Sequence, residues 1–266
     1  MEIPNKEYAS FKVILVIVIF IFLNFSFSYS QNDSIADHDF TRQLWFELKP
    51  SWKLSERTRL NTDISYRTNE PKNGERFVSK AEIQYQLKQL NLKNLKFNHA
   101  VTGGIGYFYI NNFNAVNAFE YRIYQGYSLG FNFTKRTKFN QYLRLEERFT
   151  NLFREENSSF GLRLRYKISG IINLSDLFAD KSKGFYIPAD VEFFFNIKKS
   201  KQINDVIRIT PGIGYVFNPS FKAQFSIGYH YTKQEFENLV RTNDIIFQLR
   251  VYKTFPLRLV KDPHEL

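Results

Sequence analysis

The chain has 266 residues, contains no cysteine and carries a formal net charge of +11 at pH 7. Without cysteine it can form neither a disulfide framework nor a lipid-anchored N-terminus, so an exported fold needs another source of stability. The aromatic content of 18%, almost all Phe and Tyr, suits β-strands and membrane-interface girdles better than helices.

Residues 1–30 have the pattern of a secretory signal peptide. Two lysines give a positively charged start, residues 13–23 are an unbroken apolar run, and residues 28–30 form a small-x-small cleavage site. The alternative is an uncleaved membrane anchor, but eleven apolar residues fall short of the roughly 20 that span a bilayer as a helix. We therefore predict a signal peptide over residues 1–30 and a single β-barrel domain over residues 31–266.

From residue 44 onward, one segment after another alternates apolar and polar residues with a period of two, as β-strands do. In residues 160–168, bulky apolar side chains alternate with glycine and basic residues, so one face of the strand is apolar and the other polar. We predict eleven such segments: 44–49, 59–67, 77–88, 95–110, 118–133, 139–149, 160–168, 185–196, 205–217, 221–232 and 243–255.

Most segments are 9 to 16 residues long, against about 5–6 for a usual globular strand and about 9–11 for a tilted membrane-spanning strand. Short connections alternate with longer polar ones, which is typical of outer-membrane barrels. The longer connections are residues 68–75, 111–117, 150–158, 197–204 and 233–241.

Outer-membrane barrels commonly have an even number of strands, with both chain ends in the periplasm. The eleven segments therefore predict a twelfth strand within residues 33–41, or ten strands in total. Residues 170–184 could hold a short helix or a broken strand.

The alternation fits two kinds of barrel. In a soluble lipocalin-like barrel the aromatic side chains fill the core, whereas in a membrane barrel they face lipid and charges line the interior. The segment lengths, the export signal and the bulky apolar faces favour the membrane. Phe and Tyr also gather near segment ends, at residues 107–109, 131–133 and 215–217, where interface girdles belong. We predict an all-β, antiparallel, outer-membrane type transmembrane β-barrel of about 10–12 strands.

The last segment, residues 243–255, alternates and ends on Phe255, like the strands that the barrel-assembly machinery recognises. Lys253 interrupts its apolar face and residues 256–266 continue the chain, so an ordinary final strand is the alternative. The assembly machinery is therefore a predicted partner, and the role of residues 256–266 stays open.

Four short stretches carry a family resemblance. They are QYLRLEERF at residues 141–149, LRLRY at 162–166, DVEFFFN at 190–196 and GIGY at 212–215. Together, in this order after a signal peptide, they resemble a family of uncharacterised exported proteins from Gram-negative bacteria, regarded as small outer-membrane β-barrels of unknown function. The likeness spans about residues 40–255; it implies the architecture and supplies no catalytic residue.

If the polar faces point inward, the barrel lumen holds a dense network of charges. The predicted network is Arg59, Asp63, Arg67, Glu82, Glu120, Arg122, Arg144, Glu146, Arg148, Arg163, Arg165, Lys167, Asp190, Glu192, Arg208 and Arg250. Unpaired ions in a confined space cost several kcal/mol each, so these side chains should pair and fix the strand register. The alternative is a conducting pore whose excess of arginine selects small anionic solutes.

The densest part of this network lies on two neighbouring segments. Arg144, Glu146 and Arg148 alternate on one, and the two arginines of residues 160–168 lie on the next, so adjacent strands could bring all five together. In the same register Glu147 faces lipid, which requires either a position near an interface or a bulge that reverses the alternation.

A lipid-modifying enzyme is one alternative function. His230 shares a polar face with Ser226, but there is no G-x-S-x-G elbow and no partner fixed by spacing, and His99 falls on an apolar face. Without cysteine or a His pair at ligand spacing, we predict no metal site, and likewise no catalytic or cofactor-binding site. The glycines of residues 103–106 indicate a bulge, a bend or a close packing site.

The predicted function is a structural or interaction protein of the bacterial outer membrane, with a charged and largely filled lumen. The alternatives are a narrow channel for small anionic solutes, a lipid-modifying enzyme, and a soluble periplasmic barrel that binds an apolar ligand. The predicted partners are outer-membrane lipid and lipopolysaccharide, the assembly machinery and, for a channel, anionic solutes. Nucleic acid is not expected, because basic and aromatic residues do not interleave on one face.

Overall fold

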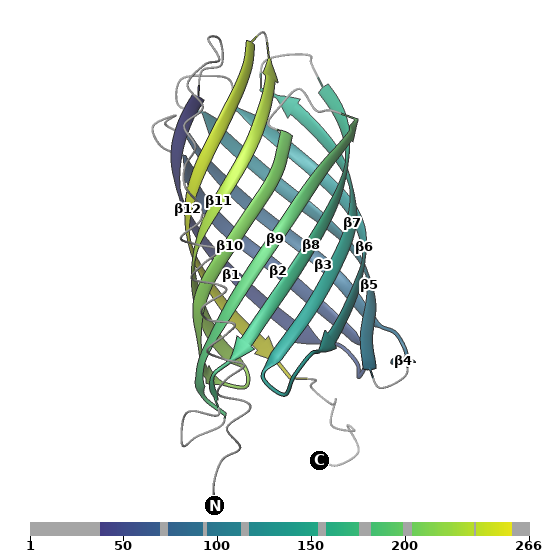
Figure 1. Ribbon diagram of the computed structural model, residues 1–266. Helices are drawn as coiled ribbons and strands as arrows, with labels where there is room; N and C mark the ends of the chain where they lie inside the picture. Colours follow the sequence, from purple (N-terminus) through teal and green to yellow (C-terminus); the bar gives the residue numbers. More distant parts are fainter. Residues whose placement is uncertain are drawn as a thin grey trace, which may run out of the picture. The chain divides into compact units, whose positions relative to one another are not determined.

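The computed structural model shows a chain of long β-strands that close into a barrel (Figure 1). It describes residues 38–69, 74–92, 95–112, 117–153, 158–175, 182–198, 204–236 and 238–256. Residues 1–30 lie outside the described residues, so the signal peptide remains a prediction. Nearly all of the C-terminal extension, residues 256–266, also lies outside them. Within the described part, no helix is long and apolar enough to cross a membrane.

Eleven long strands form the barrel wall. They are β1 (His38–Lys53), β2 (Thr58–Asn69), β3 (Gly74–Gln86), β5 (Leu95–Asn112), β6 (Ala118–Asn132), β7 (Thr137–Leu152), β8 (Ser158–Asn173), β9 (Gly184–Lys198), β10 (Asn204–Asn218), β11 (Phe221–Phe236) and β12 (Asn238–Phe255). A short strand, β4 (Leu90–Leu92), pairs with the start of β5 outside the closed ring. Each long strand coincides with one predicted segment, so the prediction of an all-β barrel is confirmed.

Strands that follow one another in the sequence pair antiparallel, and two further pairings close the ring. β3 pairs with β5 past the β4 hairpin, with Gly74 opposite Asn112. β1 pairs with β12 in parallel, with Glu47 opposite Arg250. The barrel is therefore antiparallel everywhere except at this one seam.

The eleven strands of the described ring lie within the predicted range of about 10–12, but the expected even number of strands is wrong. The strand expected within residues 33–41 is, over its described part, the beginning of β1 at His38. Because β1 and β12 run in the same direction, evenly spaced parallel hydrogen bonds can join the first and last strands of an odd-numbered ring. We call the end at which β1 begins the upper end, and the end at which β1 and β12 finish the lower end, as oriented in Figure 1.

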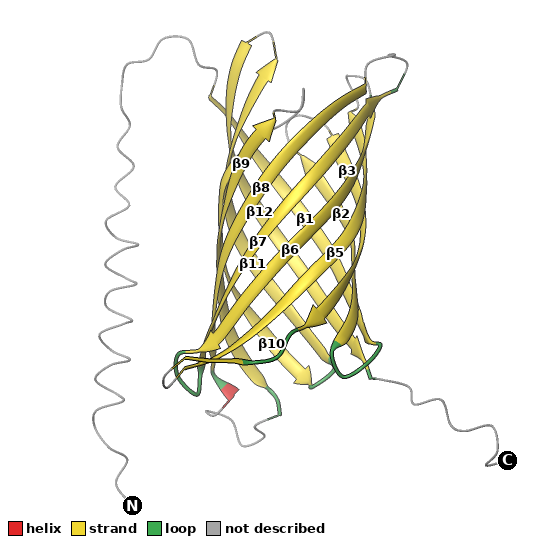
Figure 2. Cartoon of the chain, turned by 90° about the vertical axis from the view of Figure 1, so that its right-hand side faces the viewer, coloured by secondary structure: helices red, strands yellow, loops and turns green. Residues whose placement is uncertain are grey.

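The predicted alternation of short and long connections is also wrong, because strands continue into regions assigned to loops. β11 and β12 pair as far as Phe236 opposite Asn238, within the connection predicted for residues 233–241. β8 runs on to Asn173, into residues predicted to hold a short helix or a broken strand. Ladder hydrogen bonds need only the backbone, so a strand can extend beyond the apolar alternation that reveals it. Described turns such as residues 54–57 and 133–136 lie at the lower end (Figure 2).

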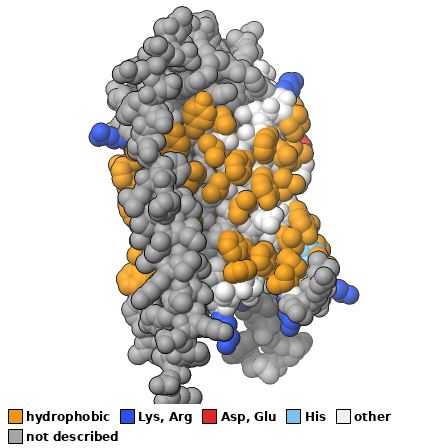
Figure 3. Space-filling view, in the orientation of Figure 1, with side chains coloured by type: hydrophobic (Ala, Val, Ile, Leu, Met, Phe, Trp, Pro, Cys, Tyr) orange, Lys and Arg blue, Asp and Glu red, His pale blue; other side chains and the backbone are white. Residues whose placement is uncertain are grey.

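Side chains alternate between the lumen and the outer wall. Polar side chains face the interior and apolar side chains face outward, which is the reverse of a soluble protein. Among the described residues, the buried set comprises 19 polar or charged residues and 9 hydrophobic ones. All eleven long strands carry exposed large apolar side chains on the outward face, such as Phe46 on β1 and Ile105 on β5. Apolar side chains accordingly cover much of the visible wall in Figure 3.

Aromatic side chains on the outer wall gather into two rings. The lower aromatic ring includes the pairs Trp52–Phe255, Phe97–Phe131, Phe131–Phe139, Phe185–Tyr215 and Phe217–Phe221, with centroids 4.9–5.8 Å apart. The upper aromatic ring includes Tyr66–Phe77, Tyr107–Tyr121, Phe119–Phe153 and Phe149–Phe160, 5.0–5.3 Å apart. Aliphatic side chains such as Ile64, Ile105 and Ile123 occupy the wall between the rings.

Two local features left open by the sequence are resolved by the strand register. The β5–β6 ladder is continuous through Gly104, where a Cβ atom would lie 2.5 Å from the Tyr124 ring, so this glycine serves close packing. Glu147 faces outward opposite Ile123, and neither ladder of β7 contains a bulge. Glu147 is two residues from Phe149 of the upper aromatic ring, which places it near one edge of the apolar wall.

Candidate functional site

All sixteen residues of the predicted charge network lie on inward-facing positions of the strands. Thirteen of them take part in ion pairs: Asp63, Arg67, Glu120, Arg122, Arg144, Glu146, Arg148, Arg163, Arg165, Asp190, Glu192, Arg208 and Arg250. The period of two in the sequence thus brings charges from separate strands together inside the barrel.

Glu146 is the hub of the network. Its carboxylate accepts hydrogen bonds from Arg163 at 2.6 and 3.0 Å and from Arg165 at 2.7 Å. Arg144 lies 2.5 Å and Arg122 3.8 Å from the same group. Glu146 is only 1% exposed. One buried carboxylate therefore holds four guanidinium groups, which come from β6, β7 and β8.

Arg148 departs from the predicted cluster of five and belongs to a second carboxylate, Glu120. Arg148 donates to Glu120 at 2.8 and 3.2 Å, and Thr150 donates to it at 3.0 Å. Arg122 donates to Glu120 as well as approaching Glu146. Arg122 therefore links the two carboxylates.

The network continues around the lumen to the parallel seam. Glu192 pairs with Arg165 and, at 3.4 Å, with Arg208. On β1, Glu47 accepts from Arg250 of β12 at 2.9 Å and from Arg67 of β2 at 3.2 Å. The Glu47–Arg250 pair crosses the seam between the first and last strands.

Three predicted network residues have no ion pair within the described part of the chain, and a further group was missed. The three are Arg59, Lys167 and Glu82; the amide of Asn61 donates to Glu82 at 3.2 Å. Lys49, which lies 2.9 Å from Asp63, was missed although it has the same parity as Glu47. Lys49 is the last residue of the predicted segment 44–49, so applying the parity of Glu47 to the end of that segment would have found it.

Inward-facing aromatic side chains were also missed, because the sequence interpretation placed aromatic residues on the lipid side. The Trp45 ring lies 3.8 Å from the Arg67 guanidinium carbon, and the Phe108 ring lies 3.6 Å from that of Arg122. Phe194 is within 5.2 Å of three arginines. These cation–π contacts pack the space between charged side chains.

The upper half of the lumen is filled, whereas the lower half contains a cavity. In the upper half, Glu120, Thr150 and Arg163 are each at most 2% exposed, and the Phe194 ring lies 5.1 Å from the guanidinium carbon of Arg163. Towards the lower end the side chains of Lys49 and Asp190 are 25% and 19% exposed. Water therefore reaches the lower lumen, and the network above it is packed tightly.

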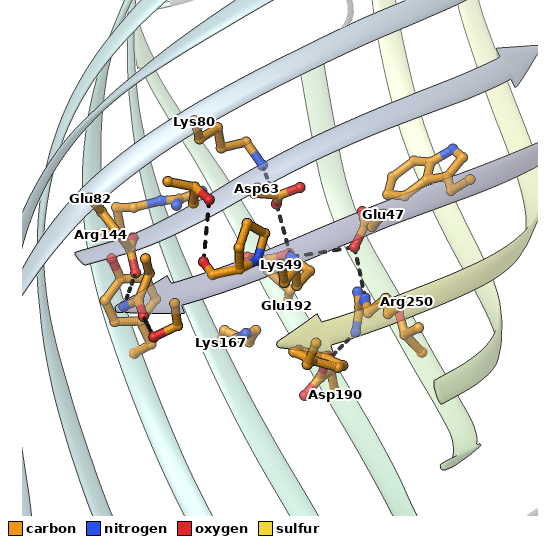
Figure 4. A pocket seen from close by; sticks show the side chains of 18 of the residues that line it. Glu47, Lys49, Asp63, Lys80, Glu82, Arg144, Lys167, Asp190, Glu192 and Arg250 are labelled. Atoms are coloured by element: carbon orange, nitrogen blue, oxygen red, sulfur yellow. Dashed lines mark hydrogen bonds and ion pairs between the residues drawn. The ribbon is translucent and has the colours of Figure 1, made fainter. Parts of the chain in front are cut away.

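The lumen cavity has a volume of about 420 Å³ (Figure 4). Its charged lining residues are Glu47, Lys49, Arg59, Asp63, Arg67, Lys80, Glu82, Arg144, Arg165, Lys167, Asp190, Glu192, Arg208, Lys222 and Arg250. Ten of these are cationic and five are anionic, which gives the lining a formal charge of +5. Apart from Trp45 and Pro50, every lining side chain carries a charged, hydroxyl or amide group.

The structure does not bring His230 and Ser226 together. His230 lies 3.3 Å from Arg208 and 3.6 Å from Asp244, whereas Ser226 accepts a hydrogen bond from Gln224 at 2.9 Å. Residues four apart on a strand are about 13 Å apart along it. His99 faces outward, with Nε2 2.7 Å from the Lys88 carbonyl oxygen. In the described residues, no group of three His, Asp or Glu side chains could hold a metal ion.

Comparison with known protein families identifies the family of this chain. The pattern of a family described as "Protein of unknown function (DUF2490)" matches residues 42–241. The chain belongs to the DUF2490 family. This match confirms the resemblance to an uncharacterised family inferred from the four sequence stretches. No curated protein and no solved structure gives a significant match to this DUF2490 chain.

Proposed function

We propose that this DUF2490 protein is an integral outer-membrane barrel that serves as a structural or interaction component and does not conduct solutes. The observation that carries the proposal is the inverted polarity: an apolar outer wall between two aromatic rings surrounds a core of paired charges. A monomeric soluble protein rarely exposes contiguous apolar patches larger than a few hundred Å², and here every long strand contributes to one. Strands of 12 to 18 residues suffice to cross a bilayer at a tilt.

The protein should be recovered from the membrane fraction of the producing bacterium and require detergent for extraction. An unboiled sample should migrate differently from a boiled one on a denaturing gel, because a closed β-barrel resists the detergent until it is heated. Both properties can be read from one fractionation experiment. Recovery in the soluble periplasmic fraction, with no heat-dependent mobility, would contradict the proposal.

The second candidate is a narrow anion channel, and the observation that favours it is the +5 charge of the cavity lining. The filled upper half argues against conduction, since Glu120, Thr150 and Arg163 are each at most 2% exposed there. We expect no steady current in planar bilayers under applied voltage. Steady currents that are carried by anions and grow with salt concentration would favour the channel instead.

A further inference from the structure

The lumen cavity has more cations than its own carboxylates can neutralise. Four of its five lining carboxylates already pair with at least one cation of the lumen; the fifth, Glu82, accepts a hydrogen bond from the amide of Asn61 at 3.2 Å. Asp63 lies 2.9 Å from Lys49 and 3.0 Å from Lys80. Glu47 pairs with three cations, Glu192 with two, and Asp190 with Arg250 at 3.6 Å.

Three lining cations have no carboxylate within ion-pair distance in the described part of the chain. They are Arg59 on β2, Lys167 on β8 and Lys222 on β11. Lys167 lies opposite Glu192 in the ladder, but Glu192 is held by two arginines, and Lys167 stands among the lining residues without an ion pair (Figure 4). Lys222 faces the Tyr252 ring at 4.5 Å. Unneutralised like charges in a confined space are unfavourable, so the arrangement calls for a counter-ion.

We propose that the lumen cavity is a binding site for a small multivalent oxyanion, held by Lys167, Lys222 and Arg59. A multivalent ion fits better than chloride, because the cations come from three separate strands and the lining charge is +5. The volume of about 420 Å³ is in the range of small-ligand pockets, roughly 300–1,000 Å³. The nearly complete absence of apolar lining residues disfavours a lipid or another apolar ligand.

The ligand enters from the lower end. Arg59 is exposed and lines both the lumen cavity and a second cavity at the lower mouth, where Lys53, Arg57 and Arg59 outnumber one carboxylate, Glu56. These basic residues give the mouth the same sign of charge as the cavity, which attracts anions towards it. The filled upper half closes the other side, so the site is a blind pocket.

The inference goes beyond the proposed function and does not depend on it. The site consists of side chains inside the barrel, so it can be tested separately even if the outer wall faces water in the cell. Failure of the site likewise leaves the barrel and its apolar wall unaffected.

The test is titration calorimetry of the full chain, purified in an uncharged detergent at low ionic strength, with inorganic pyrophosphate as the probe. We expect saturable binding of about one pyrophosphate per barrel, with a dissociation constant below about 1 mM. Sodium chloride at matched ionic strength should give no saturable heat. Citrate, a carboxylate of similar charge, shows whether the site requires phosphate groups, and binding of either probe supports the oxyanion class.

Lys167→Met and Lys222→Met each remove a charge while keeping most of the side-chain length, and each should weaken binding at least tenfold. Lys253→Met is the matched control, because Lys253 is on the outward face directly beside Tyr252 and should leave binding unchanged. Heat-dependent gel mobility verifies that each variant is folded, and the second lysine variant serves if the first does not fold. Absence of saturable binding to wild type, or equal weakening by all three substitutions, would overturn the proposal.

Discussion

Replacing Glu146 by Gln should destabilise the barrel by about 3–5 kcal/mol, the range expected when one partner of a buried ion pair is removed. The amide keeps the shape of the carboxyl group but carries no charge, so Arg144, Arg163 and Arg165 lose the carboxylate they share. The desolvation of those guanidinium groups would then be left uncompensated. The measurement is the urea midpoint for unfolding of the protein reconstituted in lipid vesicles.

The neighbouring residue provides the control for that measurement. Glu147→Gln makes the same chemical change one position along β7, but Glu147 faces outward between Ile123 and Leu162 and has no ion pair in the described part of the chain. It should leave stability unchanged or increase it, since an ion on the apolar wall is removed. Equal loss from both substitutions would show that Glu146 is not the centre of a buried network.

Placing an arginine at Val101 should cost about 2–4 kcal/mol if the wall faces lipid, the value found for basic residues near the bilayer midplane of such barrels. Val101 is 42% exposed and lies on β5, four residues from Phe97 of the lower aromatic ring and six from Tyr107 of the upper one. If the wall faced water, the same substitution would change stability by no more than about 0.5 kcal/mol, as surface substitutions usually do. Unfolding in vesicles therefore distinguishes the two environments.

Phe133→Arg is the companion variant. Phe133 is 67% exposed, more than Val101, but it lies in the turn after β6, beyond the wall. Arginine there can reach the interface or water, so the expected effect is small in either environment. A large effect at residue 101 with a small one at residue 133 supports lipid around the wall; small effects at both would refute it.

The alternation of side chains was enough to predict the strands and the inward face, because a period of two assigns every residue of a strand to one side. It located all eleven long strands. The rule that outer-membrane barrels have even strand numbers led to the wrong prediction of twelve or ten strands. The rule describes barrels closed by an antiparallel pair. The residues of β1 and β12 do not indicate that these two strands pair in parallel. Inward and outward side chains alternate along a strand in the same way whether its neighbour runs parallel or antiparallel.

The interior could be predicted only in part. Glu146 and Arg163 were placed on the same face and do meet, but the assignment of Arg148 to Glu120 depends on the relative register of β6 and β7. Phe194 has the parity of Glu192, so the alternation could have placed its side chain in the lumen, but it does not specify that the ring packs among three arginines. Cavities likewise follow from how side chains fill a three-dimensional space, which a one-dimensional pattern does not specify.

The parallel seam also decides what genetic engineering this barrel permits. β1 starts at the upper end and β12 finishes at the lower end, so the first residue of β1 and the last residue of β12 are separated by the full height of the wall. In a barrel with an even number of strands a few residues can join such ends to make a circular permutant; here a linker would have to run the length of a strand, roughly 50 Å for 16 residues. Reporter domains attached just before β1 and just after β12 would occupy opposite sides of any membrane that holds the barrel. Protease added to one side would then remove one reporter and spare the other, and which one it removed would reveal the orientation of the barrel.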